Sequence, residues 1–204
     1  MHYNVPKELI NMILYHGSRT PGIKVLEPCQ ADHDRPYIYL TTIEAVAAFY
    51  LCNAVERPYY WFPYGFQRNH PNIPVYDELY PDALKEVSEG IRGWIYSVEV
   101  SEEDVLPFGS NPSARLSVKP LQVSGCMEVP DAYALFQEYL RQGKMGLVRY
   151  EDMTPRHLHF YHRMIREYMH RKQMHMIPDC SYARFIRQKF PEVWAEFILE
   201  CSKQ

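Results

Sequence analysis

The chain has 204 residues, 47% of them hydrophobic and 23% charged, and its net charge is −3. These values exclude a disordered chain and predict a soluble globular protein of one domain, or of one domain with an appendage. The longest apolar runs are far too short to span a membrane, and the N-terminus lacks the basic and apolar regions of a secretory signal.

The first predicted elements are two strands and a helix. The apolar run NMILY (residues 11–15) predicts a buried strand that ends in the turn HGSRTPG (16–22), and YIYLTT (37–42) predicts a second strand. Thr42 is then expected to cap a helix over IEAVAAFYLCNAV (43–55), because apolar residues recur there at helical spacing.

The middle of the chain predicts a loop, a short helix, two strands and a longer helix. Residues 57–79 are rich in proline and aromatic residues without a steady period, which favours a strand leading into a long ordered loop. A short helix over 81–88 is followed by the alternating strand GWIYSVEV (93–100). A second strand over 118–129 is interrupted by Pro120, and a helix is expected over 130–143.

The C-terminal part differs in charge and pattern. Residues 1–150 contain 13 Lys and Arg against 18 Asp and Glu, whereas residues 151–204 contain 9 against 7. From Thr154 onward the pattern is helical: Pro178 breaks the first helix, and two more are expected over residues 182–189 and 191–201. The sequence therefore predicts an α+β domain over 1–150 with a basic, His-rich helical extension, residues 151–204, packed on it.

The composition of this extension suggests two binding roles. One basic helix face could contact nucleic-acid phosphates, although a solvated face is the simpler explanation. His159 and His162 could share a metal ion, but no cysteine lies in this helix to complete a zinc site, so no metal is expected. The five cysteines are widely spaced, which predicts free thiols and a cytoplasmic location.

Two groups of residues suggest a binding site. In His16-Gly17-Ser18, the glycine has no Cβ to obstruct a ligand that approaches the backbone; the alternative is a turn with a surface histidine. Tyr39 on a strand and Tyr50 on the next helix could clasp a flat aromatic ring by stacking; the alternative is that both are core residues.

A strand ending in YHGS, a strand with the IYL tyrosine and a helix with a further tyrosine together resemble the ADP-ribosyltransferase fold. The variant resembled is the His-Tyr-Glu type of diphtheria toxin and poly(ADP-ribose) polymerase, which has split antiparallel sheets with interspersed helices. The resemblance implies that His16 binds the ribose on the nicotinamide side of NAD and that the backbone of Gly17 pairs with the carboxamide. It also implies that Tyr39 and Tyr50 flank the nicotinamide ring, with Ser18 close by.

The third signature residue of that family, a glutamate near the start of a late strand, is not matched. The corresponding run ARLSVKPLQVSGCMEV opens with basic and polar residues and offers Glu128 only at its far end. The resemblance makes Glu128 the candidate catalytic residue, because a carboxylate stabilises the positive charge that develops on ribose as nicotinamide leaves. The alternative is a solvated acid at a strand end. Arg57 and Arg68 are candidates to meet the pyrophosphate.

The resemblance implies an NAD-binding mono-ADP-ribosyltransferase that passes ADP-ribose to a protein or nucleic-acid acceptor, with no membrane partner. Because the glutamate position is unmatched, a catalytically inactive binding or regulatory domain of the same fold stays an alternative. A third possibility is a nucleic-acid-associated accessory protein that works through its basic helices.

Overall fold

The computed structural model describes residues 11–31, 34–52, 64–109 and 111–203. The contacts within the chain divide it into two compact units, each built from two separate segments. Unit 1 comprises residues 1–52 and 88–139, and unit 2 comprises residues 53–87 and 140–204. The single boundary at residue 150 remains a prediction. The mixture of helices with mainly antiparallel sheets, followed by a helical C-terminal region, agrees with the α+β expectation.

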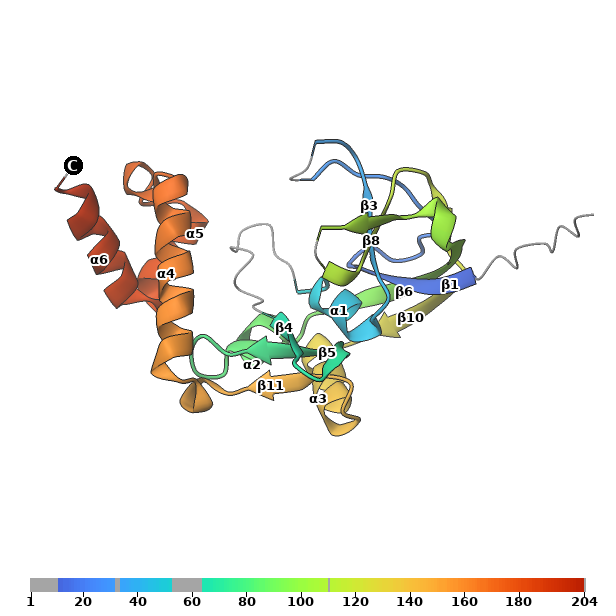
Figure 1. Cartoon of the computed structure of the whole chain (residues 1–204), viewed down its shortest axis with the longest axis horizontal. Coiled ribbons are helices and arrows are strands. Elements are labelled where there is room, and N and C mark those ends of the chain that lie inside the picture. The colour runs from blue at the N-terminus through green and yellow to red at the C-terminus, as the bar shows by residue number, and fades with distance from the viewer. Residues whose placement is uncertain (1–10, 32–33, 53–63, 110, 204) are drawn as a thin grey trace, which may run out of the picture. The chain divides into compact units, whose positions relative to one another are not determined.

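Unit 1 is built on a six-stranded antiparallel sheet of order β10-β6-β1-β3-β8-β7 (Figure 1). A two-stranded sheet pairs β2 with β9. The elements of the unit are β1 (Asn11–Ser18), β2 (Val25–Leu26), β3 (Ile38–Thr41), α1 (Glu44–Phe49), β6 (Gly93–Ser101), the 3₁₀ turn η2 (Glu102–Asp104), β7 (Leu106–Phe108), β8 (Asn111–Ser117), β9 (Leu121–Gln122), β10 (Gly125–Val129) and α3 (Ala132–Arg141).

The two faces of this sheet are covered differently. On one face Leu14, Leu40 and Val98 pack with other aliphatic side chains into a buried cluster. The opposite face carries α1 and α3, whose Phe49 and Phe136 rings lie 5.3 Å apart. Because side chains alternate along a strand, the residues of β1 divide between these faces. Leu14, His16 and Ser18 share the aliphatic face, whereas Tyr15 and Gly17 face the helices.

Several predicted boundaries in unit 1 are corrected. The first strand does not end at Tyr15: β1 continues through Ser18 and stays paired with β6 throughout. Helix α1 ends at Phe49, and Thr42 does not cap it, since Ile43 occupies the N-cap position without a side-chain bond. The predicted strand over 118–129 is two strands, β9 and β10, and Pro120 lies outside both.

Unit 2 combines a three-stranded sheet, of order β11-β5-β4, with helices. Strands β4 and β5 form an antiparallel hairpin, and β11 joins β5 in parallel. Helices α4 and α6 contact each other and lie side by side in Figure 1. The elements are β4 (Tyr64–Gln67), β5 (His70–Asp77), α2 (Ala83–Ser88), β11 (Gly146–Val148), the 3₁₀ turns η3 (Tyr150–Asp152) and η4 (Met174–Met176), α4 (Pro155–Arg171), α5 (Ser181–Lys189) and α6 (Pro191–Cys201).

A strand leading into a long ordered loop was expected over 57–79, but residues 64–77 form the β4–β5 hairpin. Arg68 lies between the two strands of this hairpin, and Arg57 lies outside the described residues. Helix α4 ends at Arg171, before Pro178, and Gln173 then adopts a left-handed conformation with φ of 49°. No helix among the described residues is long and apolar enough to cross a membrane.

Candidate functional site

The centre of the candidate site is the place where β1 and β3 part. β1 is paired with β6 along its whole length, from Asn11 to Ser18. Its pairing with β3 is restricted to Tyr15 opposite Thr41. Residues 16–18 therefore have a neighbour on one side only, and the sheet is split at His16. Backbone N–H and C=O groups at such a split can bond to a ligand rather than to a strand.

His16 spans this split with its side chain. Its Nδ1 atom lies 2.9 Å from the backbone oxygen of Tyr39. Since a carbonyl oxygen only accepts hydrogen bonds, Nδ1 carries the hydrogen, and Nε2 of the neutral ring is an acceptor. Burial lowers the pKa of His16 below its usual 6.5, although the bond to Tyr39 acts in the opposite direction. The imidazole is thus held neutral, with Nε2 able to accept a bond from a hydroxyl.

The lowered pKa of His16 has a consequence for stability. As the pH falls from 6.5 through the lowered pKa, the unfolded chain binds a proton on His16 that the folded chain does not, so the free energy of unfolding should decrease. Urea unfolding at a series of pH values should show a smaller decrease for His16→Gln than for the wild type. His162, in unit 2, also has a pKa lowered by burial. The variant His162→Gln therefore shows how much of the pH dependence of unfolding comes from His162. Equal pH dependence of the wild type and His16→Gln would contradict this assignment.

Gly17 lies directly beneath α1. A Cβ atom on Gly17 would be 2.0 Å from the backbone oxygen of Ala47, so no larger residue fits without moving the helix. The same oxygen accepts a hydrogen bond of 3.1 Å from the backbone nitrogen of Tyr50, which ends α1. The close approach at Gly17 therefore brings the end of α1, with the 48% exposed side chain of Tyr50, next to the split.

Tyr39 contributes both its backbone and its ring. The backbone oxygen holds His16, and the half-buried ring makes edge contacts with Tyr37 and Phe108, each at 6.3 Å between centroids. By strand alternation the ring lies on the face opposite to the His16 side chain. The structure thus joins Tyr39 to His16 through the main chain of Tyr39, whereas the sequence implied only that the two residues share a ligand.

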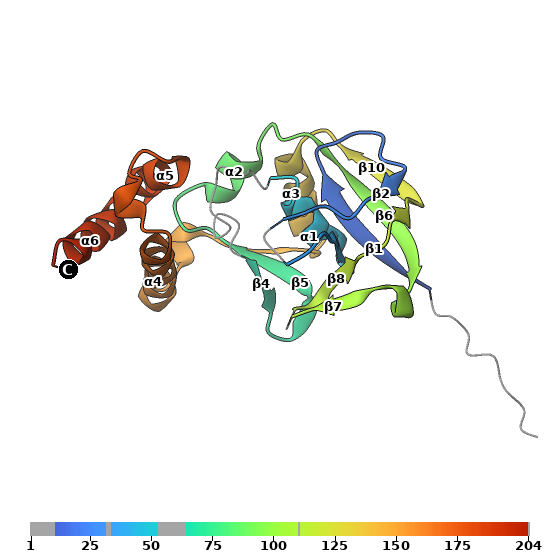
Figure 2. The same ribbon diagram turned by 90° about the horizontal axis from the view of Figure 1, so that it is seen from above.

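Glu128 lies two strands away from Ser18 in the same row of the sheet. Strand β6 lies between β1 and β10 (Figure 2). Ser18 is opposite Trp94 on β6, and Trp94 is opposite Glu128 on β10. Directly opposed residues share a face, so Glu128 and Ser18 lie on the same side as His16. Two strand spacings separate them by roughly 10 Å. Because β6 lies between β1 and β10, a ligand that reaches both Ser18 and Glu128 has to lie on this face of the sheet, across β6.

Glu128 is not a solitary acid at a strand end. Arg92 donates a hydrogen bond and forms an ion pair with its carboxylate, and the Arg92 guanidinium also lies 5.5 Å from the centre of the Trp94 ring. Both charged side chains are at least half exposed, so the pair is weakly held and open to exchange with a ligand. The alternating pattern of β6 did not reveal this partner, because Arg92 precedes the strand.

Tyr96 is a further residue of this region that sequence reasoning did not single out. It is fully buried, directly opposite His16, and its hydroxyl donates to the backbone oxygen of Thr20 at 2.7 Å. The same hydroxyl accepts from the backbone nitrogen of Ile23 at 3.3 Å. Thr20 and Ile23 are the first and last residues of the turn that follows β1. Tyr96 therefore attaches this turn to the sheet beside His16.

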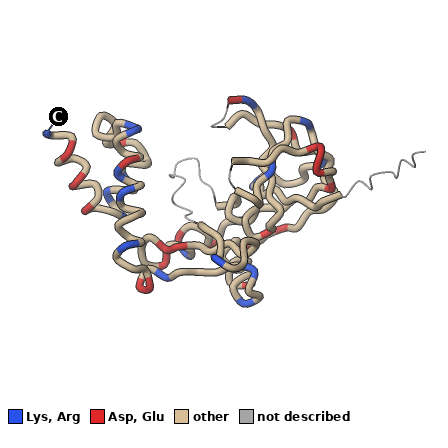
Figure 3. Tube along the Cα trace, viewed as in Figure 1, with Lys and Arg blue, Asp and Glu red and all other residues tan. Residues whose placement is uncertain are grey.

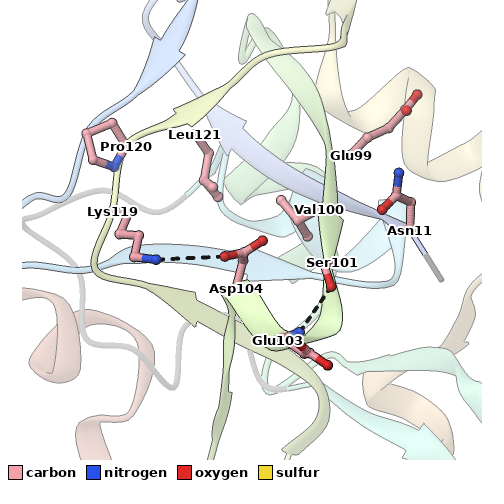
Figure 4. Close-up of a pocket in the computed structure, with 9 residues that line it drawn as sticks. All are labelled: Asn11, Glu99, Val100, Ser101, Glu103, Asp104, Lys119, Pro120 and Leu121. Atoms are coloured by element: carbon pink, nitrogen blue, oxygen red, sulfur yellow. Dashed lines mark hydrogen bonds and ion pairs between the residues drawn. The ribbon is translucent and has the colours of Figure 1, made fainter. Parts of the chain in front are cut away.

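A hollow at the far end of β1 is chemically different. It has a volume of about 510 Å³ and is lined mainly by polar residues, with Lys119 and Asp104 facing each other at 3.8 Å (Figure 4). Asn11, which also lines the hollow, is five positions before His16, or roughly 17 Å along the strand. Three carboxylates, Glu99, Glu103 and Asp104, line this hollow, so it suits the phosphates of a dinucleotide poorly.

The histidines and arginines of the C-terminal helices are largely occupied within unit 2. His170 lies 2.7 Å from Glu200, and Arg166 pairs with Glu196 at 2.6 Å. His162 packs edge-on against Phe190. Within the described ranges, no three His, Cys, Asp or Glu residues are grouped to hold a metal ion. Nucleic-acid binding by this face stays a prediction, and these contacts leave fewer of its charges available for phosphates.

Comparisons of the chain with models of protein families, with curated proteins and with solved structures gave no match.

Proposed function

We propose that unit 1 binds NAD at the split between β1 and β3 and cleaves the bond between nicotinamide and ribose. The electron pair of that bond leaves with nicotinamide, and C1′ of the ribose becomes positively charged. A nucleophile of a protein or nucleic-acid acceptor then bonds to C1′ and releases its proton, which completes transfer of ADP-ribose. The protein would accordingly be a mono-ADP-ribosyltransferase, an enzyme of the glycosyltransferase class.

The observation that carries the proposal is the hydrogen bond from His16 to the Tyr39 backbone across the split. It fixes the tautomer in which Nε2 can accept a bond from a ribose hydroxyl. The unpaired edge at Gly17 can supply backbone groups to a carboxamide, and Tyr50 offers an exposed ring beside it. Glu128, on the same face as His16, is the carboxylate that would stabilise the charge at C1′.

The ion pair between Arg92 and Glu128 favours a second candidate, an NAD-binding domain without turnover. A carboxylate that remains paired with Arg92 is partly neutralised and stabilises a developing positive charge less. The two candidates share the ligand and differ in whether nicotinamide is released. A cytoplasmic setting is proposed for both, since the five cysteines are widely spaced in the sequence and do not form the pattern of a disulfide framework.

The test is whether NAD binds and nicotinamide is released. NAD at 100 times its dissociation constant should raise the free energy of unfolding by about 2.7 kcal/mol, measured as a shift in thermal unfolding. We expect His16→Ala to weaken NAD binding by about tenfold, because one hydrogen bond to the ligand is lost. Chromatography of the reaction mixture then measures nicotinamide.

His157→Ala is the matched control, because His157 is an exposed histidine of unit 2. It should bind NAD as the wild type does. Binding without nicotinamide release would select the non-catalytic candidate. No thermal shift with either NAD or nicotinamide would contradict both candidates.

A further inference from the structure

The turn that follows β1 carries positive charge next to the split. Between Ser18 and Lys24 the sequence is SRTPGIK, with two basic residues and no acidic one. Arg19 directly follows Ser18 and is exposed, and in the described ranges it forms no ion pair. The other guanidinium of this region, on Arg92, is already paired with Glu128. Arg19 is therefore a cation at this end of the sheet that a ligand can reach without displacing a carboxylate.

The opposite end of the same strands is acidic. Glu102, Glu103 and Asp104 form one continuous acidic run at η2, seen as a red segment in Figure 3. An anionic ligand is thus disfavoured at the hollow near Asn11. The distribution of charge along the sheet therefore favours an anionic ligand at the end that carries His16 and Arg19.

The position of Arg19 is fixed from both sides. Before it, Ser18 belongs to β1, and its Oγ accepts a hydrogen bond of 3.1 Å from the backbone nitrogen of Thr20. After it, the turn Thr20-Pro21-Gly22-Ile23 has Gly22 at φ of 71°, as in a type II turn with proline before glycine. The Tyr96 hydroxyl bonds to the first and the last residue of this turn, at 2.7 and 3.3 Å.

We propose that Arg19 binds a phosphate group of the ligand and that Tyr96, through its turn, is the positioning residue for Arg19. This inference rests on the proposed function and specifies its ligand as phosphate-bearing. A guanidinium presents several N–H donors that match phosphate oxygens. Because the turn is already held in place, little conformational freedom is lost when the ligand binds.

The experiment compares ligands with and without phosphate by isothermal titration. We expect Arg19→Gln to weaken binding of NAD and of ADP-ribose by about tenfold or more, and to leave nicotinamide riboside unaffected. Lys119→Gln is the matched control: it removes one positive charge from the acidic end of unit 1 and should change none of the three affinities.

The outcomes separate this inference from the function on which it rests. If the wild type binds NAD and Arg19→Gln binds it equally well, the phosphate role of Arg19 is overturned and the proposed function survives. If the wild type binds neither NAD nor nicotinamide riboside, the proposed function is overturned, and the inference falls with it.

The role of Tyr96 is tested by coupling. Tyr96→Phe keeps the buried ring and removes the hydroxyl. Made in the wild type, it should weaken NAD binding a few-fold. Made in the Arg19→Gln variant, it should cause no further loss of affinity. A purely structural role would give the same loss in both backgrounds, and that result would overturn the positioning role. Tyr139→Phe, which removes a buried hydroxyl bonded to Glu44, should leave NAD binding unchanged.

Discussion

Replacing Gly17 with alanine should destabilise unit 1 by about 3 kcal/mol, or prevent its folding. The added Cβ would lie 2.0 Å from the backbone oxygen of Ala47. Neither atom can move by a change of rotamer, because the backbone fixes the position of a Cβ and the Ala47 oxygen is itself a backbone atom. Helix α1 would therefore have to separate from β1. The buried apolar residues of that helix, Val46 and Phe49 among them, would lose packing. Urea unfolding followed by circular dichroism measures the change.

Gly65→Ala is the control for this substitution. Gly65 is also a strand glycine, it has no positive φ, and a Cβ built on it meets no atom within 4 Å. It should change the free energy of unfolding by less than about 0.5 kcal/mol. If Gly17→Ala is as stable as the wild type, the close packing of α1 on β1 is wrong. The glycine after the histidine thus has a packing role that is independent of any ligand.

Replacing Glu128 with glutamine should slow nicotinamide release by about 100-fold and leave the affinity for NAD within a few-fold of the wild type. The amide has nearly the shape of the carboxylate but no charge, so it cannot stabilise the cation that develops on ribose. The effect should therefore fall on kcat rather than on KM. Steady-state kinetics with chromatographic detection of nicotinamide separates the two.

Two further variants define what this result means. Glu99→Gln removes an exposed carboxylate from β6 and, by strand alternation, from the other face of the sheet, so kcat should be unchanged. Arg92→Gln releases Glu128 from its ion pair and should not decrease kcat. Equal kcat for Glu128→Gln and the wild type would remove Glu128 from the chemistry and leave the split without an identified acid.

Much of the sheet could be predicted because its strands carry local signals. The alternation in residues 93–100 gave β6, and the apolar run after Asn11 gave β1. Over 57–79 the sequence predicted one strand and a loop rather than the β4–β5 hairpin, since prolines argue against a second strand. β11 pairs only with Val75 to Asp77 of β5. The edge of β5 that faces β11 is therefore unpaired at Pro71 and Pro74, and the prolines are tolerated there.

The candidate site was predictable only in part, for a similar reason. The order of His16, Tyr39 and Tyr50 in the sequence indicated a shared neighbourhood, but the bond between His16 and Tyr39 runs to a backbone atom that every residue possesses. Likewise, alternation placed Tyr96 on a definite face, whereas the partners of its hydroxyl are main-chain atoms far away in the sequence. The residue types in a sequence do not reveal such contacts between a side chain and the main chain, because these contacts depend on where the strands diverge.

The interleaving of the two units has a consequence for how the protein is made. β1 ends at Ser18, but β6, which pairs with it along its whole length, begins only at Gly93. Likewise, β5 ends at Asp77, and its parallel partner β11 begins only at Gly146. A ribosome therefore releases most of the chain before either sheet can be completed. Pairings so distant in sequence form slowly, and the waiting strands expose apolar residues such as Leu14. We expect neither unit to finish folding until its later segment has been synthesised, and the unfinished chain to depend on chaperones.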